Sequence, residues 1–131
     1  MKDRYDSIVV GGGPSGAIAA KTIADSGLSV CILEKDKKIG TPVRCGEAIS
    51  EEGLRQFIEP RKSWIAARIN KFRLISPNGT AIDAGFQNQF GYILHREIFD
   101  YDLAMIAAES GAEIVTGAYV KGLLFTKDKV S

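Results

Sequence analysis

The chain contains little cysteine, little histidine and no marked excess of charge of either sign. Two cysteines and one histidine among 131 residues do not suggest a disulfide framework or a metal site. The 17 basic side chains nearly balance the 16 acidic ones. This balance leaves no basic field for nucleic acid and no polybasic patch for a membrane surface. Cys31, in an apolar run, and Cys45 favour a reducing cytoplasm.

Long apolar runs are also missing. None approaches the roughly 20 residues that a membrane-spanning helix needs. The segment Met1–Arg4 lacks the apolar core of a signal peptide, so we expect a cytoplasmic chain. The hydrophobic content of 45% is enough for one modest domain with a core.

Glycine, in contrast, is concentrated in the N-terminal stretch YDSIVVGGGPSG, residues 5–16. Ile8–Val10 predicts a short, fully buried strand, and Gly11, Gly13 and Gly16 follow it with G-x-G-x-x-G spacing. Gly11 would permit a tight turn. Gly13 would let the backbone approach a pyrophosphate, and Gly16 would let a helix pack closely on the strand.

A helix is predicted to begin at Pro14, because proline suits the first helical position. The N–H groups of Ser15 and Gly16, together with the helix dipole, would form an anion site. The helix should extend to Ser26, and Gly27 should end it in a left-handed conformation.

The second apolar run, residues 28–33, predicts a second parallel strand that ends at Glu34. A carboxylate at that position can accept hydrogen bonds from both hydroxyls of an adenosine ribose. It would repel a 2′-phosphate, which disfavours NADP even though Lys35 is adjacent. Strand, glycine turn, helix and acid together predict a dinucleotide-binding site.

The rest of the chain gives a series of weaker predictions. They are an irregular stretch 36–50, a helix from Ser50 to Phe57, a hairpin of 71–76 and 81–83 around Pro77-Asn78-Gly79, a short apolar piece 92–94, a helix 96–110 capped by Gly111, a strand 113–115, a further strand 118–125 and a turn 126–129. A long insertion therefore separates the second and third parallel strands. That layout is typical of flavoproteins of the glutathione-reductase and hydroxybenzoate-hydroxylase type, and it favours FAD over NAD.

Two further segments carry a more specific resemblance. Residues 39–48, IGTPVRCGEA, resemble the P-V-R-C-G-E segment of the geranylgeranyl reductase family, above all its archaeal digeranylgeranylglycerophospholipid reductases. Residues 92–100, YILHREIFD, resemble the family's Y-x-L-x-R-x-x-F-D segment. With the glycine turn and Leu33-Glu34-Lys35, the resemblance covers almost the whole chain.

This resemblance implies a set of cofactor-binding residues. Ser15 would contact the pyrophosphate, Glu34 the ribose and Ala118 the adenine. The full set is Gly11, Gly13, Pro14, Ser15, Gly16, Glu34, Lys35, Arg44, Cys45, Gly46, Ala48, Arg96 and Ala118, in which Arg44, Cys45, Gly46 and Ala48 would line the reactive end of FAD and Arg96 would also contact the cofactor. No residue is a convincing proton donor. Cys45 is a candidate for a chemical role, and an inert role for it remains open.

The expected fold is α/β: a Rossmann-like parallel FAD-binding sheet with an inserted antiparallel hairpin from a substrate domain. Residues 1–131 would be the N-terminal part of the FAD-binding domain, with 66–94 belonging to or leading into the substrate domain. The family's later glycine–aspartate segment is absent. We therefore expect the C-terminal remainder to be missing and the isolated fragment to be inactive.

The resemblance implies an FAD-dependent reductase that saturates geranylgeranyl double bonds of membrane lipids. It would use a prenylated lipid substrate and an electron donor that the sequence does not identify. A peripheral membrane contact of the full-length protein would be compatible with such a substrate. Two alternatives stay open at this point: a flavin monooxygenase of the same fold, and a non-catalytic nucleotide-binding fragment.

Overall fold

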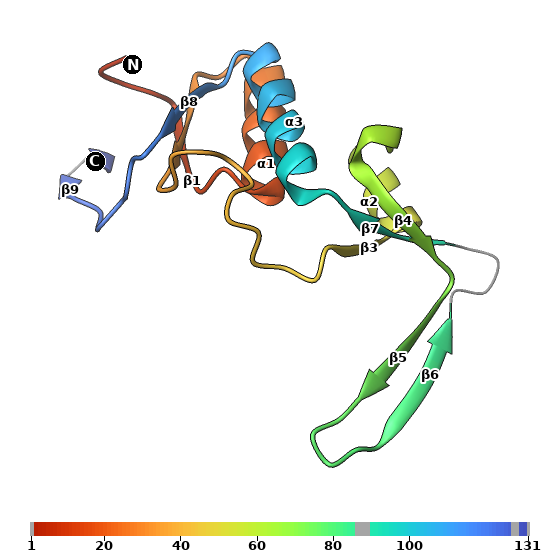
Figure 1. Cartoon of the computed structure of the whole chain (residues 1–131). Coiled ribbons are helices and arrows are strands. Elements are labelled where there is room, and N and C mark those ends of the chain that lie inside the picture. The colour runs from red at the N-terminus through yellow and green to blue at the C-terminus, as the bar shows by residue number, and fades with distance from the viewer. Residues whose placement is uncertain (1, 86–89, 127–128, 131) are drawn as a thin grey trace. The chain divides into compact units, whose positions relative to one another are not determined.

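A computed structural model describes residues 2–85, 90–126 and 129–130, and the chain divides into two compact units. Residues 1–42 and 100–131 form the first unit, and residues 43–99 form the second, which we call the inserted unit. Helix α3, Arg96–Glu109, begins at the end of the inserted unit and continues into the first (Figure 1).

The first unit is built on a parallel sheet of three strands in the order β1–β2–β8. Strand β1 is Ser7–Val10, the central β2 is Val30–Glu34 and β8 is Glu113–Thr116. Helix α1, Pro14–Asp25, connects β1 to β2 and ends before Gly27, which has the expected positive φ of 83°. The predicted parallel sheet is therefore confirmed.

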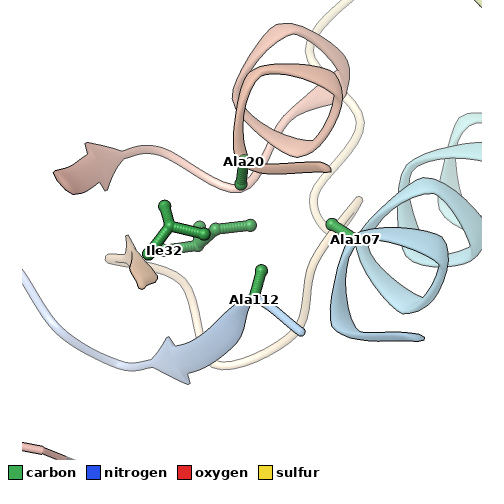
Figure 2. Close-up of a cluster of buried hydrophobic side chains, with 5 residues drawn as sticks. Ala20, Ile32, Ala107 and Ala112 are labelled. Atoms are coloured by element: carbon green, nitrogen blue, oxygen red, sulfur yellow. The ribbon is translucent and has the colours of Figure 1, made fainter. Parts of the chain in front are cut away.

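The core of this unit lies between the helices and one face of the sheet. Figure 2 shows Ala20 of α1, Ala107 of α3 and Ala112, just before β8, gathered around Ile32 of β2. Val30 completes the buried cluster. Alanine at the helix positions lets both helices lie close to the strand, where larger side chains would hold them away.

Strand β1 differs from the prediction of a fully buried strand. Val9 packs against the core, but Ile8 is 50% exposed and Val10 61% exposed. Successive side chains of a strand point to opposite faces, and β1 lies at the edge of the sheet. In the described part of the chain only one of its faces is covered. The apolar run correctly indicated a strand but not its one-sided burial.

The inserted unit contains an antiparallel sheet in the order β3–β7–β4. Its strands are Ala48–Ser50, Gly91–Leu94 and Ile65–Ile69 respectively. Residues 36–50 were expected to be irregular, and neither β3 nor β4 was predicted. Helix α2, Glu51–Arg55, follows β3 directly and is shorter than expected. Its first turn is capped by Ser50, whose Oγ accepts a hydrogen bond from Gly53 N at 3.0 Å.

Trp64 anchors the interior of the inserted unit. It ends the short 3₁₀ helix η1, Lys62–Trp64, and is fully buried. Its ring meets that of Phe99 edge-on, with centroids 5.1 Å apart. Buried aromatic pairs of this kind contribute packing energy and fix orientation, which accounts for Trp64 as a packing residue.

The predicted hairpin is present. Strands β5, Lys71–Ile75, and β6, Ala81–Gly85, pair antiparallel, and Gly79 takes a φ of 85° in the turn. Figure 1 shows the two as a long ribbon of their own. On one face Arg73 forms a salt bridge with Asp83, while the other face carries exposed apolar side chains.

The predicted strand 118–125 does not form. Strand β8 ends before Gly117, which has a φ of 70°, and residues 118–124 are not part of a strand. Strand β9, Phe125–Thr126, pairs with β10, Lys129–Val130. The middle of the predicted turn, residues 127–128, lies outside the described residues. None of the helices described is long and apolar enough to cross a bilayer.

Candidate nucleotide-binding site

The glycine turn joins the end of β1 to α1. Gly11 has a φ of 103°, a conformation that L-residues other than glycine rarely adopt. Its N–H donates a hydrogen bond to Leu33 O at 2.9 Å and so fixes the turn to the end of β2. The predicted role of Gly11 in a tight turn is in agreement with this geometry.

Gly16 and Gly13 face different surroundings. A Cβ atom at Gly16 would lie 2.0 Å from Gly11 O, a distance that no side chain can occupy. A Cβ atom at Gly13 would meet no atom within 4 Å. The structure thus accounts for Gly16 by close packing of the helix on the turn. It leaves open space over Gly13, where a pyrophosphate could approach the backbone.

The N-terminus of α1 has amides that come before the first intrahelical hydrogen bond. Pro14 begins the helix, and the first intrahelical bond runs from Ala17 N to Gly13 O at 2.9 Å. The amides of Ser15 and Gly16 precede that bond, and Gly13 has no side chain to cap them. Together with the helix dipole they form a site suited to an anion.

Glu34 lies at the carboxyl end of β2 and is only 9% exposed. Its Oε2 accepts a hydrogen bond from Gly12 N at 2.6 Å, and its Oε1 accepts one from Asp36 N at 2.8 Å. Burial by itself would raise the pKa of this carboxyl. The two amides and the charge of Lys35 outweigh burial and lower the pKa, so the group is ionised at neutral pH.

The carboxylate of Glu34 keeps acceptor capacity for a ligand. Two carboxylate oxygens offer about four lone-pair directions, and the amides of Gly12 and Asp36 use one on each oxygen. Ala118, just past β8, lies next to the backbone of Glu34, because Ala118 N donates to the backbone oxygen of Glu34 at 2.8 Å. The three strand-end segments expected at the nucleotide site are therefore adjacent.

Gly12 also belongs to the candidate site, although it was not among the predicted residues. It occupies a variable position of the G-x-G-x-x-G pattern, yet it is buried and donates to Glu34. A Cβ atom there would lie 3.2 Å from Ile39 Cδ1 and 3.3 Å from Glu34 Cβ. The run of three consecutive glycines, where the pattern needs only the outer two, was the available signal.

The other predicted cofactor residues lie in the inserted unit. Arg44, Cys45 and Gly46 are exposed residues of the loop before β3, and Ala48 is the first residue of that strand. Cys45 Sγ accepts a weak hydrogen bond from Glu47 N at 3.4 Å.

Arg96, the first residue of α3, is half-buried. It follows His95, whose N–H donates to Trp64 O at 2.8 Å. The structure thus collects the predicted residues into two groups, one in each unit.

A three-strand parallel sheet, a glycine turn into a helix and an acid at the end of the second strand define a Rossmann-like nucleotide-binding domain. The family pattern described as "NAD(P)-binding Rossmann-like domain" matches residues 9–61. The halogenase PltM, solved in complex with phloroglucinol and FAD, superposes with a TM-score of 0.72 at 21% identity, over 98% of this chain and 31% of PltM. This likeness shows the shared fold.

Three other proteins have a higher sequence identity to this chain than PltM. The digeranylgeranylglycerophospholipid reductase of Methanoculleus marisnigri is 53% identical over 88% of this chain and 30% of its own length. That of Methanocella arvoryzae is 44% identical over 99% of the chain and 34% of its length. A geranylgeranyl bacteriochlorophyll reductase-like protein from Thermoplasma acidophilum superposes with a TM-score of 0.84 at 37% identity, over 96% of this chain and 33% of that one.

The chain spans about a third of the length of these relatives. In sequence and fold it is similar to the N-terminal portion of these reductases and of the geranylgeranyl bacteriochlorophyll reductase-like protein. The resemblance expected from the P-V-R-C-G-E segment is confirmed.

Proposed function

We propose that this chain is the N-terminal part of an FAD-dependent reductase that saturates isoprenoid double bonds of membrane lipids. The observation that carries the proposal is the 53% identity, over 88% of the chain, to a protein named digeranylgeranylglycerophospholipid reductase. The resemblance is supported by a strand-end site whose geometry suits a dinucleotide. An electron donor would be a separate protein or small molecule.

The residues of the first unit fit the adenosine half of FAD. The amides of Ser15 and Gly16 would bind the pyrophosphate over the open space at Gly13. The free lone pairs of Glu34 would accept hydrogen bonds from the ribose hydroxyls, and Ala118 would lie against the adenine. Lys35 supports the site through its charge, which helps to keep Glu34 ionised.

The loop of the inserted unit would serve the flavin half. Arg44 offers a planar set of donors for phosphate or flavin oxygens, and Gly46 would let the backbone lie flat against a ring. Cys45 and Ala48 are small neighbours in the same segment, and Arg96 would reach the cofactor from the start of α3. The hairpin lies within residues 66–94, which we assign to the substrate domain or to the path into it.

Bound FAD, once reduced, would supply a hydride to one carbon of the alkene while a proton reaches the other carbon. The residues of this chain would hold the cofactor and orient it against an apolar substrate. They would also exclude water from the reacting atoms. None of the described side chains is assigned as the proton donor.

The test of the cofactor uses the natural protein that carries this sequence, at its full length. We expect it to purify with the visible absorbance of FAD, and Glu34→Ala should weaken FAD binding by about 1–3 kcal/mol through loss of charged hydrogen bonds. Glu59→Gln, in an exposed carboxylate outside both groups, should bind FAD like the wild type. Unchanged affinity in Glu34→Ala, or a preference for NAD, would contradict the assignment.

The test of the reaction uses the same protein with a chemical reductant and a geranylgeranyl lipid. Mass spectrometry should show a gain of two hydrogens for each double bond reduced. A gain of one oxygen atom instead would identify a monooxygenase of the same fold. FAD binding with neither product would favour a nucleotide-binding role without catalysis.

A further inference from the structure

The backbone of Glu47 has a conformation that is usual for glycine and uncommon for glutamate. Among the described residues, the left-handed backbone conformation occurs at six glycines and at Glu47, where φ is 64°. Glycine adopts this conformation without steric cost, whereas for a glutamate it is uncommon and costs energy. A backbone need alone would be met by glycine, as it is elsewhere in this chain.

The backbone of Glu47 is fixed on both sides. Its N–H donates to Cys45 Sγ at 3.4 Å, and its O accepts a hydrogen bond from Leu94 N at 3.0 Å. These bonds tie the loop to the central strand β7 and hold Glu47 just before Ala48, where β3 begins. The strained conformation is therefore held in place by its surroundings, as strained residues at functional sites usually are.

The carboxylate, in contrast, has no partner in the described part of the chain. Glu47 is half-buried, and within residues 2–85, 90–126 and 129–130 its carboxylate makes no hydrogen bond or ion pair. Other glutamates of the inserted unit have partners, such as Glu51 and Glu59 with Arg55. Glu47 is thus a carboxylate placed at a conformational cost and left available.

We propose that Glu47 is a ligand-contacting residue of the Arg44–Ala48 loop. Its carboxylate accepts a hydrogen bond from a donor group of the bound flavin, either a ribityl hydroxyl or a ring N–H. The left-handed backbone sets the direction of the loop, and the carboxylate is the reason that glutamate stands there instead of glycine. This inference rests on the proposed function, because it requires that the loop binds FAD.

Three variants separate the carboxylate from the backbone. Glu47→Gly removes both the carboxylate and the strain, Glu47→Ala removes the carboxylate and keeps the strain, and Glu47→Gln keeps the shape without the charge. In the full-length protein, FAD affinity from fluorescence titration should fall about tenfold in both Gly and Ala variants, and less in the Gln variant. Glu47→Gly alone should raise the urea midpoint of the apoprotein, because glycine relieves the strain.

The matched control is Glu59→Gln, which should leave the affinity for FAD unchanged. Wild-type affinity in Glu47→Gly would show that only the backbone conformation matters, and it would overturn the inference. So would a loss of stability in Glu47→Gln without a change in affinity, since the carboxylate would then pair with another part of the protein. Failure of the wild type to bind FAD would overturn the proposed function, and the inference with it.

Discussion

Gly16 and Gly13 belong to the same turn, but a methyl group added at each would have opposite consequences. At Gly16 it would collide with the backbone oxygen of Gly11 at 2.0 Å, and neither backbone segment can move away cheaply. At Gly13 it would enter open space, and the φ of −72° suits any L-residue. Gly16 therefore allows the helix to pack closely on the turn, and Gly13 leaves the backbone accessible to a ligand.

We expect Gly16→Ala to lower the free energy of unfolding by about 1–3 kcal/mol, the usual cost of overpacking. Gly13→Ala should stay within about 1 kcal/mol of the wild type, because the added methyl group at this helix cap meets no atom within 4 Å. It should nevertheless weaken FAD binding by crowding the pyrophosphate. Urea denaturation and fluorescence titration measure the two effects. A Gly13→Ala variant with unchanged affinity would show that nothing approaches the backbone there.

Glu34 gives the site a pH dependence whose direction follows from its pKa. The pKa is lowered in the folded chain, so ionised Glu34 contributes stability above its unfolded pKa of about 4.3. That contribution is lost as the pH falls through the lower folded value. Glu34→Gln should therefore be less stable than the wild type at neutral pH, by about 1–3 kcal/mol, because charged hydrogen bonds to two amides are lost.

The difference between wild type and Glu34→Gln should shrink as the pH falls below about 4. Urea titrations at several pH values test this, with Glu59→Gln as the exposed-carboxylate control. If the difference in free energy of unfolding stays constant over that pH range, burial of Glu34, and not its hydrogen bonds to the two amides, determines its contribution to stability.

Much of the site at the residue scale could be predicted, because it depends on local conformation. Gly11, Gly16 and Glu34 stand where the turn, the close approach and the strand end require them. Gly12 and Glu47 were not identified in this way. Gly12 donates a hydrogen bond to Glu34, and the backbone oxygen of Glu47 accepts one from Leu94, and both partners are distant in the sequence.

Among the elements, those with strong local signals were predicted and those that depend on distant partners were not. The hairpin of β5 and β6 follows from the Pro77-Asn78-Gly79 turn between two short strands. Strand β4 forms by pairing with β7 more than twenty residues later, with an irregularity between Ile65 and Ala67. Residues 118–124 have strand-like composition but find no partner among the described residues, so propensity alone misled the prediction.

The loop before β3 is an element whose role can be tested without disturbing the fold. A side chain at Gly46 would meet no atom within 4 Å, so Gly46→Val should leave the unfolding transition nearly unchanged. If the loop covers the flavin, the same substitution should shift the visible spectrum of the bound cofactor and reduce turnover. Gly122→Val, at another glycine with open surroundings, is the control. An unaltered spectrum and turnover would make the loop a simple connection.

At the scale of the whole molecule, apolar surface remains exposed in both units. Ile8 and Val10 are exposed on β1, and Leu74 and Ile82, which pair across the hairpin, are 59% and 61% exposed. Apolar side chains on a strand edge or an open sheet face favour pairing with another chain. The relatives are about three times as long, and in them further chain is available to cover such surfaces.

We therefore predict that residues 1–131 alone bind FAD weakly or not at all, do not reduce a geranylgeranyl lipid, and self-associate. Sedimentation velocity should show a mass that rises with protein concentration. The double variant Leu74→Ser/Ile82→Ser should reduce that association while leaving far-UV circular dichroism unchanged, because both side chains are largely exposed. Lys71→Ser/Arg73→Ser, on the opposite face of β5, is the matched control. A monomeric chain that carries stoichiometric FAD and reduces the lipid would contradict this prediction. It would show that residues 1–131 are sufficient for FAD binding and for the reduction.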